Sequence, residues 1–267
     1  MALHPVKTRQ PAHRRNPANS VLASGQCFAY PKGHTPPDRP PPLMLLSTSH
    51  NFIFVHVPKT AGTALTAALA PFATTGTRTP MRRAIRWLPL HEAPDRAYFR
   101  KHETAADMAK KMGLPAYYGF HRFTVVRNPF EHAVSHYEYL KEFRNPKLAA
   151  RFAAMSFGDY LTWRTTARGL FVPSFTVIPD QAHWLVDAHG QLLVNRVMRM
   201  ESLSDDFATL TTDLGLSGVT MQRINPTQAK QKDRPLASYY DSDTLDRVRQ
   251  LYARDFDLFG YSRDLPA

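Results

Sequence analysis

The stretch Phe52–Leu69, FIFVHVPKTAGTALTAAL, decides the fold of this chain. Its first part is apolar apart from His56 and predicts a buried strand over 52–57. Pro58 ends that strand, because proline has no N–H to donate to a neighbouring strand. Apolar residues then recur at intervals of three and four, as on one face of a helix. The stretch therefore predicts a strand, a tight loop over 58–63 and a helix.

The loop has the composition of an anion-binding loop. Lysine, threonine and small residues follow one another in it as Lys59, Thr60, Ala61, Gly62 and Thr63. The free N–H groups at the start of a helix and the positive end of its dipole attract phosphate or sulfate. In a Walker A motif the lysine follows the second glycine, whereas here Lys59 precedes Gly62. The loop is therefore not predicted to bind a magnesium nucleoside triphosphate.

A second strand–turn–helix unit follows in the chain. Phe123–Val126 predicts a buried strand, and Asn128 and Pro129 are favoured residue types at the start of a helix. Arg127 lies between the two elements, where its guanidinium fork suits a phosphate group. Strands separated by helices, with no hairpin signals, predict an α/β fold with a central parallel sheet.

Composition bounds the class of protein and its partners. The chain has 267 residues, a formal net charge of +12 and one cysteine, Cys27, which excludes an intramolecular disulfide framework. The charge favours anionic partners, without choosing between nucleotides, acidic glycans, nucleic acid and anionic lipid. Residues 1–42 hold nine of the 22 prolines and predict a basic, disordered tail before one domain over 43–267.

No apolar run approaches the length of a transmembrane span, and no secretory signal is visible. We therefore expect a cytoplasmic protein. Peripheral contact with a membrane and the oligomeric state stay open.

The two strand–turn–helix units resemble the donor-binding motifs of sulfotransferases that use 3′-phosphoadenosine 5′-phosphosulfate (PAPS). The resemblance is carried by HVPKTAGTAL and FTVVRNPFEHAVSHY and extends over roughly 50–262. The branch that the chain resembles is that of carbohydrate sulfotransferases of the chondroitin and heparan 2-O type, with their bacterial relatives. The resemblance implies a P-loop-like three-layer α/β/α fold. It also implies transfer of a sulfuryl group to an acceptor hydroxyl, with a sugar favoured as acceptor.

The resemblance further implies roles for individual residues. The loop from Lys59 to Ala64 would wrap the 5′-phosphosulfate, and Lys59 would stabilise the charge on the leaving phosphate oxygen. Arg127 and Ser135 would hold the 3′-phosphate. Ser135 lies two helical turns after Asn128 and therefore on the same face of the helix. By analogy with phosphoryl transfer the displacement is in line, and the smaller charge of a sulfuryl group makes a metal unnecessary. The product would be 3′-phosphoadenosine 5′-phosphate (PAP).

A base must take the proton of the acceptor hydroxyl, and histidine suits this task near neutral pH. Among the 12 histidines, His102 is the first candidate, because in the bacterial branch a histidine stands at the start of a similar helix. His121 is the second candidate, and His56 also stays open. His132 stands where the family motif has arginine. It forms an i, i+4 pair with His136 that would suit a metal, although no third ligand is apparent.

Two other functions stay open from the residues alone. A P-loop-type nucleotide kinase acting on a small molecule would need a Walker A motif and a metal-holding aspartate, and the sequence offers neither cleanly. A nucleic-acid-binding protein would gather basic and aromatic residues on a recognised module, whereas here the charge is spread along the chain. We therefore expect an enzyme with a hydroxyl-bearing acceptor and no nucleic-acid partner.

Overall fold

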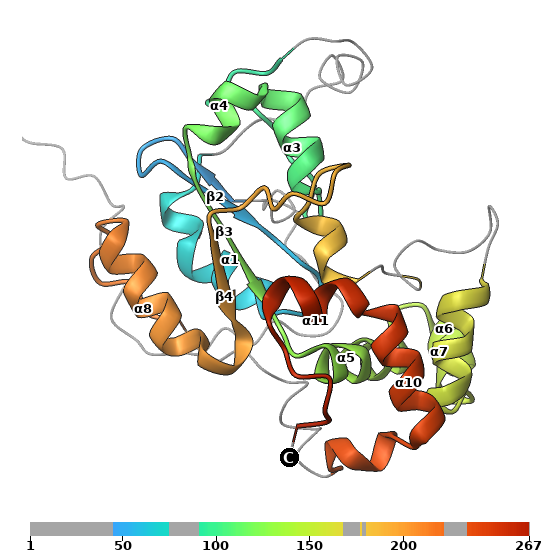
Figure 1. Ribbon diagram of the computed structural model, residues 1–267. Coiled ribbons are helices and arrows are strands. Elements are labelled where there is room, and N and C mark those ends of the chain that lie inside the picture. Colours follow the sequence, from blue (N-terminus) through green and yellow to red (C-terminus); the bar gives the residue numbers. More distant parts are fainter. Residues whose placement is uncertain (1–44, 75–90, 168–176, 178–179, 222–233, 267) are drawn as a thin grey trace, which may run out of the picture. The chain divides into compact units, whose positions relative to one another are not determined.

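A computed structural model describes residues 45–74, 91–167, 177, 180–221 and 234–266 (Figure 1). The described residues form a four-stranded sheet in the order β1-β2-β3-β4 and nine α-helices. The predicted tail over 1–42 lies outside them. No helix among the described residues is both long enough and apolar enough to cross a membrane.

The sheet is mostly parallel. Strand β2 (Phe52–Val55) pairs in parallel with β3 (His121–Val126), which pairs in parallel with β4 (Arg196–Arg199). The short edge strand β1 (Leu46–Ser47) is antiparallel to β2. The predicted α/β class with a parallel sheet is confirmed for three strands. The expectation that the chain lacks hairpins is wrong, because β1 returns into β2 over a four-residue turn. The P-loop-like three-layer arrangement stays a prediction.

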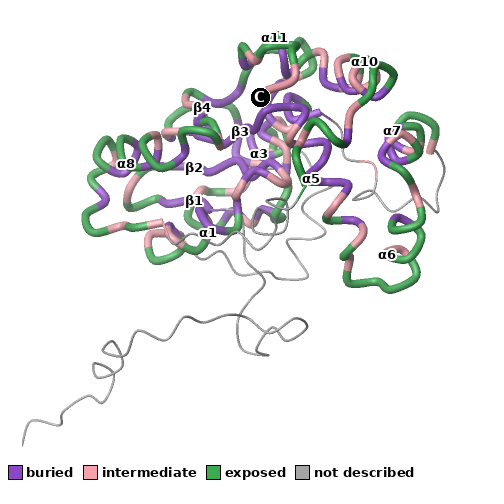
Figure 2. The backbone as a smooth tube through the Cα atoms, turned by 90° about the horizontal axis from the view of Figure 1, so that it is seen from below, coloured by how far each residue is buried: buried purple, intermediate pink, exposed green. Residues whose placement is uncertain are grey.

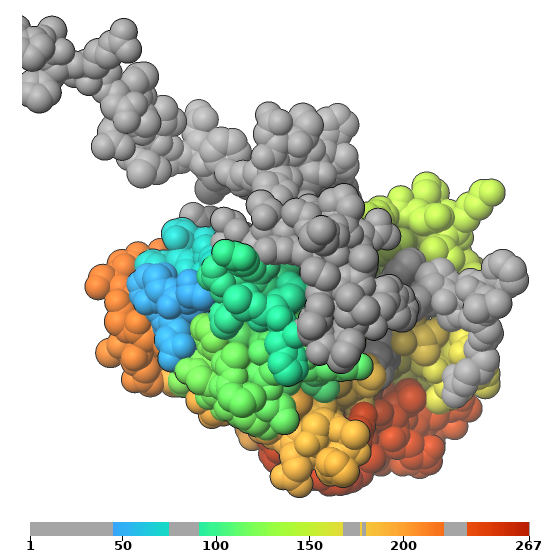
Figure 3. All heavy atoms as spheres, turned by 90° about the horizontal axis from the view of Figure 1, so that it is seen from above, coloured from blue at the N-terminus to red at the C-terminus, as the bar shows by residue number. Residues whose placement is uncertain are grey.

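Apolar side chains from both faces of the sheet form separate clusters with different helices. One face packs against α1 (Gly62–Leu69) and α8 (Leu203–Asp213). The other face packs against α3 (Ala105–Met112) and includes a residue of α4 (Leu114–Tyr118). Figure 2 shows β2 and most of β3 as continuously buried, whereas β4 is only partly buried. Figure 3 shows α3 and α4 beside the β1–β2 hairpin. Burial on both faces explains why β2 is apolar without alternation.

A third apolar cluster joins the helices that directly follow β3 to the helices near the C-terminus. The helix α5 (Pro129–Lys141) begins directly after β3 and is capped by the side chain of Asn128, as predicted. It packs with helices α6 (Pro146–Ala153), α7 (Phe157–Thr166), α10 (Ser242–Leu251) and α11 (Ala253–Phe259). Short 3₁₀ helices complete the described elements: η1 (Ala70–Phe72), η3 (Gln181–Trp184), η4 (Met200–Ser202) and η5 (Leu236–Tyr239).

Some boundaries differ from the expected ones for local reasons. The side chain of Thr104 accepts a hydrogen bond from the Asp107 N–H, so α3 begins at Ala105 and His102 lies in the segment before it. The apolar spacing over about 243–258 predicts a single helix, but the structure divides it at Tyr252, whose φ of −114° and ψ of 22° are not helical. Both differences matter for the site, because His102 and Tyr252 make contacts there.

Candidate active site

The loop between β2 and α1 has an unusual backbone. Lys59 (φ 67°) and Ala61 (φ 58°) both lie in the left-handed region, although neither is glycine. Such strain costs free energy and concentrates at ligand-binding sites. No side chain caps the first turn of α1. The N–H groups of Ala64 and Leu65 donate to the Ala61 carbonyl, which leaves those of Gly62 and Thr63 without an intrahelical partner. These donors and the helix dipole make this end of α1 suitable for an anion.

Two loop residues are fixed by what surrounds them. The Thr60 side chain is buried, and its hydroxyl donates to the Val57 carbonyl at 2.9 Å. The hydroxyl proton of Thr60 is therefore used in a hydrogen bond that stabilises the loop. Gly62 faces the ring of His56: a Cβ added at Gly62 would lie 1.8 Å from His56 Nε2. A glycine is needed here because the histidine ring fills the place of a side chain. Thr63 is exposed and Ala64 buried in the first turn of α1.

Lys59 extends from the loop toward α5. Its ammonium nitrogen lies 4.3 Å from the ring centroid of Tyr139, a cation–π contact. Burial, together with the positive charges of Arg127 and Lys101, lowers the Lys59 pKa to about 8. An anion bound beside Lys59 would relieve this repulsion. The ammonium group is thus placed where a negative charge stabilises it.

Arg127 lies at the end of β3, and its side chain is almost fully buried. Its Nε donates to Glu131 Oε2 at 2.9 Å, and Nη2 lies 2.8 Å from the same oxygen. Among the described residues, Nη1 of Arg127 has no hydrogen-bond partner. Ser135 is buried on α5, between His132 and Tyr139 on one helix face, since residues three and four apart are neighbours there. Both of those residues contact the loop.

His102 lies against the start of the same loop. Its Nδ1 donates to the His56 carbonyl at 3.1 Å, and the two imidazole rings are 4.5 Å apart. Because a carbonyl only accepts, the proton of the neutral His102 ring is on Nδ1, and Nε2 carries the lone pair. Burial of the ring, together with the positive charge of Lys101, lowers the His102 pKa below its ordinary value of 6.5. The ring is therefore neutral and basic at Nε2 near neutral pH.

An aromatic residue lies beside His102. The Trp184 ring centroid is 6.1 Å from that of His102. Trp184 belongs to η3, which Asp255 holds in place: this buried carboxylate accepts hydrogen bonds from the N–H groups of Gln181 and Ala182 and from the Gln181 side chain. Gln181 in turn bonds the backbone of Arg127 at 2.8 Å through both atoms of its amide. One network therefore positions the wall of the site and the turn after β3.

The other two histidine hypotheses are placed differently. His121 begins β3 and pairs with Phe52, so roughly 16 Å of strand separates it from Val126, the end of β3 nearest the loop. The structure does not bring it together with Lys59 or Arg127. His56 is buried, and its pKa is held well below the ordinary value, first by burial.

The pair His132 and His136 is engaged by tyrosines. The Nδ1 atom of His132 lies 2.9 Å from the Tyr252 hydroxyl, and that of His136 lies 2.6 Å from the Tyr160 hydroxyl. Among the described residues, no three metal-ligating side chains are grouped in a way that could hold an ion. The two histidines whose spacing suggested a metal site are thus hydrogen-bonded to tyrosines.

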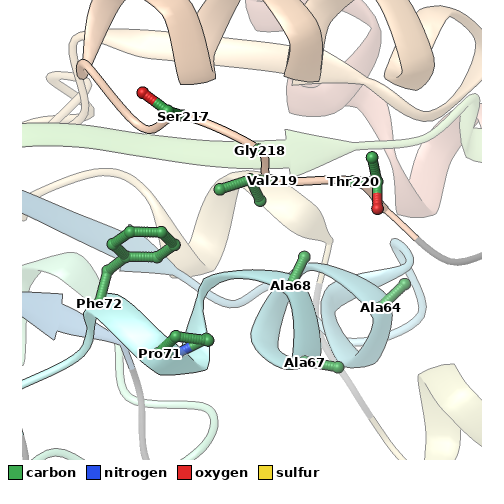
Figure 4. A pocket seen from close by; sticks show the side chains of 9 residues that line it. All are labelled: Ala64, Ala67, Ala68, Pro71, Phe72, Ser217, Gly218, Val219 and Thr220. Atoms are coloured by element: carbon green, nitrogen blue, oxygen red, sulfur yellow. The ribbon is translucent and has the colours of Figure 1, made fainter. Parts of the chain in front are cut away.

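A hollow of about 360 Å³ lies along the outer side of α1 (Figure 4). It begins at Ala64, and the segment 217–220 after α8 forms its opposite wall. The lining is made of small and apolar side chains: Ala64, Ala67, Ala68, Pro71, Phe72, Ser217, Gly218, Val219 and Thr220. A flat, weakly polar ring system fits such a surface.

A loop suited to an anion, with a neutral histidine beside it, fits an enzyme that handles an anionic group. The family model described as "Sulfotransferase family" matches residues 42–262, and the chain belongs to this family. Its reaction class is therefore sulfuryl transfer, for which sulfotransferases in general use PAPS as the donor. Neither a curated protein nor a solved structure gave a match to the chain.

Several residues of the site escaped the sequence analysis. Tyr139 and Asp255 lie in no motif, and Glu131 lies within FTVVRNPFEHAVSHY without a role that the sequence indicates. Each reaches the site through a contact distant in the sequence or along a helix face. Asp180 pairs with Arg254 at 2.6 Å, and Trp184 contacts the ring of His102.

Proposed function

We propose that this protein transfers a sulfuryl group from PAPS to a hydroxyl of a carbohydrate. The observation that carries the proposal is the pairing of a strained, uncapped loop bearing Lys59 with the neutral His102 beside it. The donor's 5′-phosphosulfate would lie against Lys59–Ala64. Arg127 and Ser135 would hold its 3′-phosphate from the turn after β3 and from α5. Family membership supports the reaction class, and a nucleotide kinase is not favoured.

The residues divide the chemistry between them. His102 Nε2 would take the proton from the acceptor hydroxyl as its oxygen attacks sulfur. The bond between sulfur and the 5′-phosphate oxygen breaks in line, and the electron pair stays on the phosphate. Lys59 and the first N–H groups of α1 would stabilise the charge that gathers there. Each of these groups acts without a metal ion.

Trp184 supports a sugar as the acceptor. Its half-buried ring lies beside His102, and a pyranose offers an apolar face that packs on an aromatic ring while its hydroxyls stay solvated. The basic residues Lys101 and His183 flank His102 and Trp184 in sequence and would favour an acidic sugar.

The hollow beside α1 would take the base of the donor. It starts two residues after Gly62 and so adjoins the proposed phosphate site. We also propose that residues 43–267 form the sulfotransferase domain and that 1–42 form a tail outside it. The cytoplasm would supply the donor.

The test uses PAPS labelled with radioactive sulfur and an extract of the source cells, followed by identification of the labelled product. The variant His102→Ala is expected to abolish labelling and to bind PAP nearly as well as the unmodified protein. The matched control is His121→Ala, at the opposite end of β3, with labelling unchanged. Normal turnover by His102→Ala would refute the role of this base, and a labelled product without a sugar would refute the acceptor class.

A further inference from the structure

A buried chain of hydrogen bonds connects α7 to the loop after β2. Arg164 Nη1 lies 2.6 Å from the Tyr252 hydroxyl, which lies 2.9 Å from His132 Nδ1. His132 Nε2 lies 2.8 Å from the carbonyl oxygen of Pro58. Arg164 and His132 are at most 4% exposed, and Tyr252 is fully buried. Four segments distant in the sequence therefore meet in one line that ends on the residue before Lys59.

The chemistry of the end groups fixes the direction of every bond. Arginine only donates, so the Tyr252 oxygen accepts from Arg164 and its hydrogen goes to His132 Nδ1. The Pro58 carbonyl only accepts, so His132 carries its proton on Nε2. Burial, together with the positive charges of Arg164, Arg127 and Lys59, lowers the His132 pKa to about 3. His132 is thus a neutral imidazole in a single tautomer.

Holding the Pro58 carbonyl orients the next N–H as well. The C=O and N–H of one peptide unit point in opposite directions because the unit is planar and trans. With the Pro58 oxygen drawn to His132 on α5, the Lys59 N–H points away from α5. Lys59 has a φ of 67°, which a non-glycine residue does not adopt without support. The chain of hydrogen bonds supplies that support from outside the loop.

We propose that Arg164 and Tyr252 act through His132 as positioning residues that fix the Pro58–Lys59 peptide, so that the Lys59 N–H meets the 5′ group of the nucleotide. The inference rests on the proposed function. It also accounts for the histidine at position 132, where the family motif has arginine: the guanidinium is supplied by Arg164 of α7. Arg164 also bonds the Tyr160 hydroxyl, which contacts His136 and not the loop.

The test compares two ligands by calorimetric titration. PAP has both phosphates, whereas adenosine 3′-phosphate lacks the 5′ group. The variant Tyr252→Phe removes one hydroxyl and is expected to weaken PAP binding about tenfold, the effect of one hydrogen bond to a charged group. Its affinity for adenosine 3′-phosphate should stay within about twofold. The matched control is Tyr160→Phe, which removes the other hydroxyl next to Arg164 and should leave the ratio of the two affinities unchanged.

A second pair of variants tests the same idea at His132. In His132→Gln the side-chain amide reaches as far as Nε2 and can still donate to Pro58, whereas in His132→Asn it is too short. We expect glutamine to keep the preference for PAP over adenosine 3′-phosphate and asparagine to lose about tenfold of it. This pair decides the question where Tyr252→Phe fails to fold.

The outcomes separate the two proposals. If the unmodified protein binds PAP no better than adenosine 3′-phosphate, the proposed function is overturned together with the inference. If it prefers PAP and Tyr252→Phe either keeps that preference or weakens both ligands equally, only the positioning role is overturned. Equal behaviour of the glutamine and asparagine variants overturns it as well.

Discussion

The substitution Gly62→Ala probes the contact between the loop and the histidine behind it. The new Cβ would lie 1.8 Å from His56 Nε2, 2.0 Å from Cδ2 and 2.6 Å from Cε1. The ring has little room to move, because it is 4% exposed, stacks on Phe54 at 5.5 Å and lies 4.5 Å from the His102 ring. Either the ring or the start of α1 must therefore shift.

The size of the effect follows from overpacking a buried site. Such changes cost about 1–3 kcal/mol, and in a domain of this length each kcal/mol lowers the melting temperature by about 2–4 °C. We expect Gly62→Ala to melt roughly 5 °C lower, or more. PAP binding should weaken by about tenfold or more, because a shift of the loop misplaces several N–H donors at once. Thermal denaturation and calorimetric titration with PAP measure the two effects.

Two further variants make the result specific. Gly158→Ala is the matched control, since its Cβ would meet Thr244 Cγ2 at 3.6 Å, an ordinary contact, and it should leave stability and binding nearly unchanged. In the double variant His56→Ala/Gly62→Ala the clash is gone, so the loss of stability should be smaller than the sum of the two single losses. A Gly62→Ala protein that melts and binds PAP like the unmodified one would refute the argument.

Three other predictions concern pH, the wall of the site and the hollow. The plot of kcat/KM against pH should stay high down to pH 6.5, because the His102 pKa is lowered. It should fall above about pH 8, where Lys59 loses its proton. Lys59→Arg should remove this alkaline fall, and a profile of the unmodified protein without the fall would contradict the role of Lys59. Asp255→Asn should lower the free energy of unfolding by about 1–3 kcal/mol, because an amide cannot accept all the hydrogen bonds that hold η3; unchanged denaturation would refute this. Ala67→Phe fills the hollow from an exposed position and should weaken PAP binding about tenfold without lowering the melting temperature. The control Ala150→Phe on α6 should change neither PAP binding nor the melting temperature. Equal binding of PAP by both variants would exclude the hollow as the site of the base.

Local features of the site could be predicted from the sequence because their signals are local. The change of period after Phe52 placed β2, the loop and the start of α1 to within two residues at each boundary. Asn128 and Pro129 placed the start of α5. The strand β1 was not predicted, because two residues are too few to show an alternation.

The contacts of the site could not be read in this way because they join distant segments. His102 is 46 residues from His56, and Tyr252 is 120 residues from His132. No period or spacing within one segment records such a contact. The resemblance to a family did not reveal it either, since position 132 departs from the family motif. Only the fold shows that a tyrosine and an arginine occupy the space behind this histidine.

Calorimetric titration of the unmodified protein tests the central claim most directly, with PAP and Mg-ATP as the two ligands. A donor site with separate places for a 5′ and a 3′ phosphate predicts binding of one PAP per chain. At one hundred times the dissociation constant, PAP should raise the free energy of unfolding by about 2.7 kcal/mol, or roughly 5–10 °C in melting temperature. Mg-ATP should give no comparable effect. Binding and stabilisation by Mg-ATP, with none by PAP, would contradict the account.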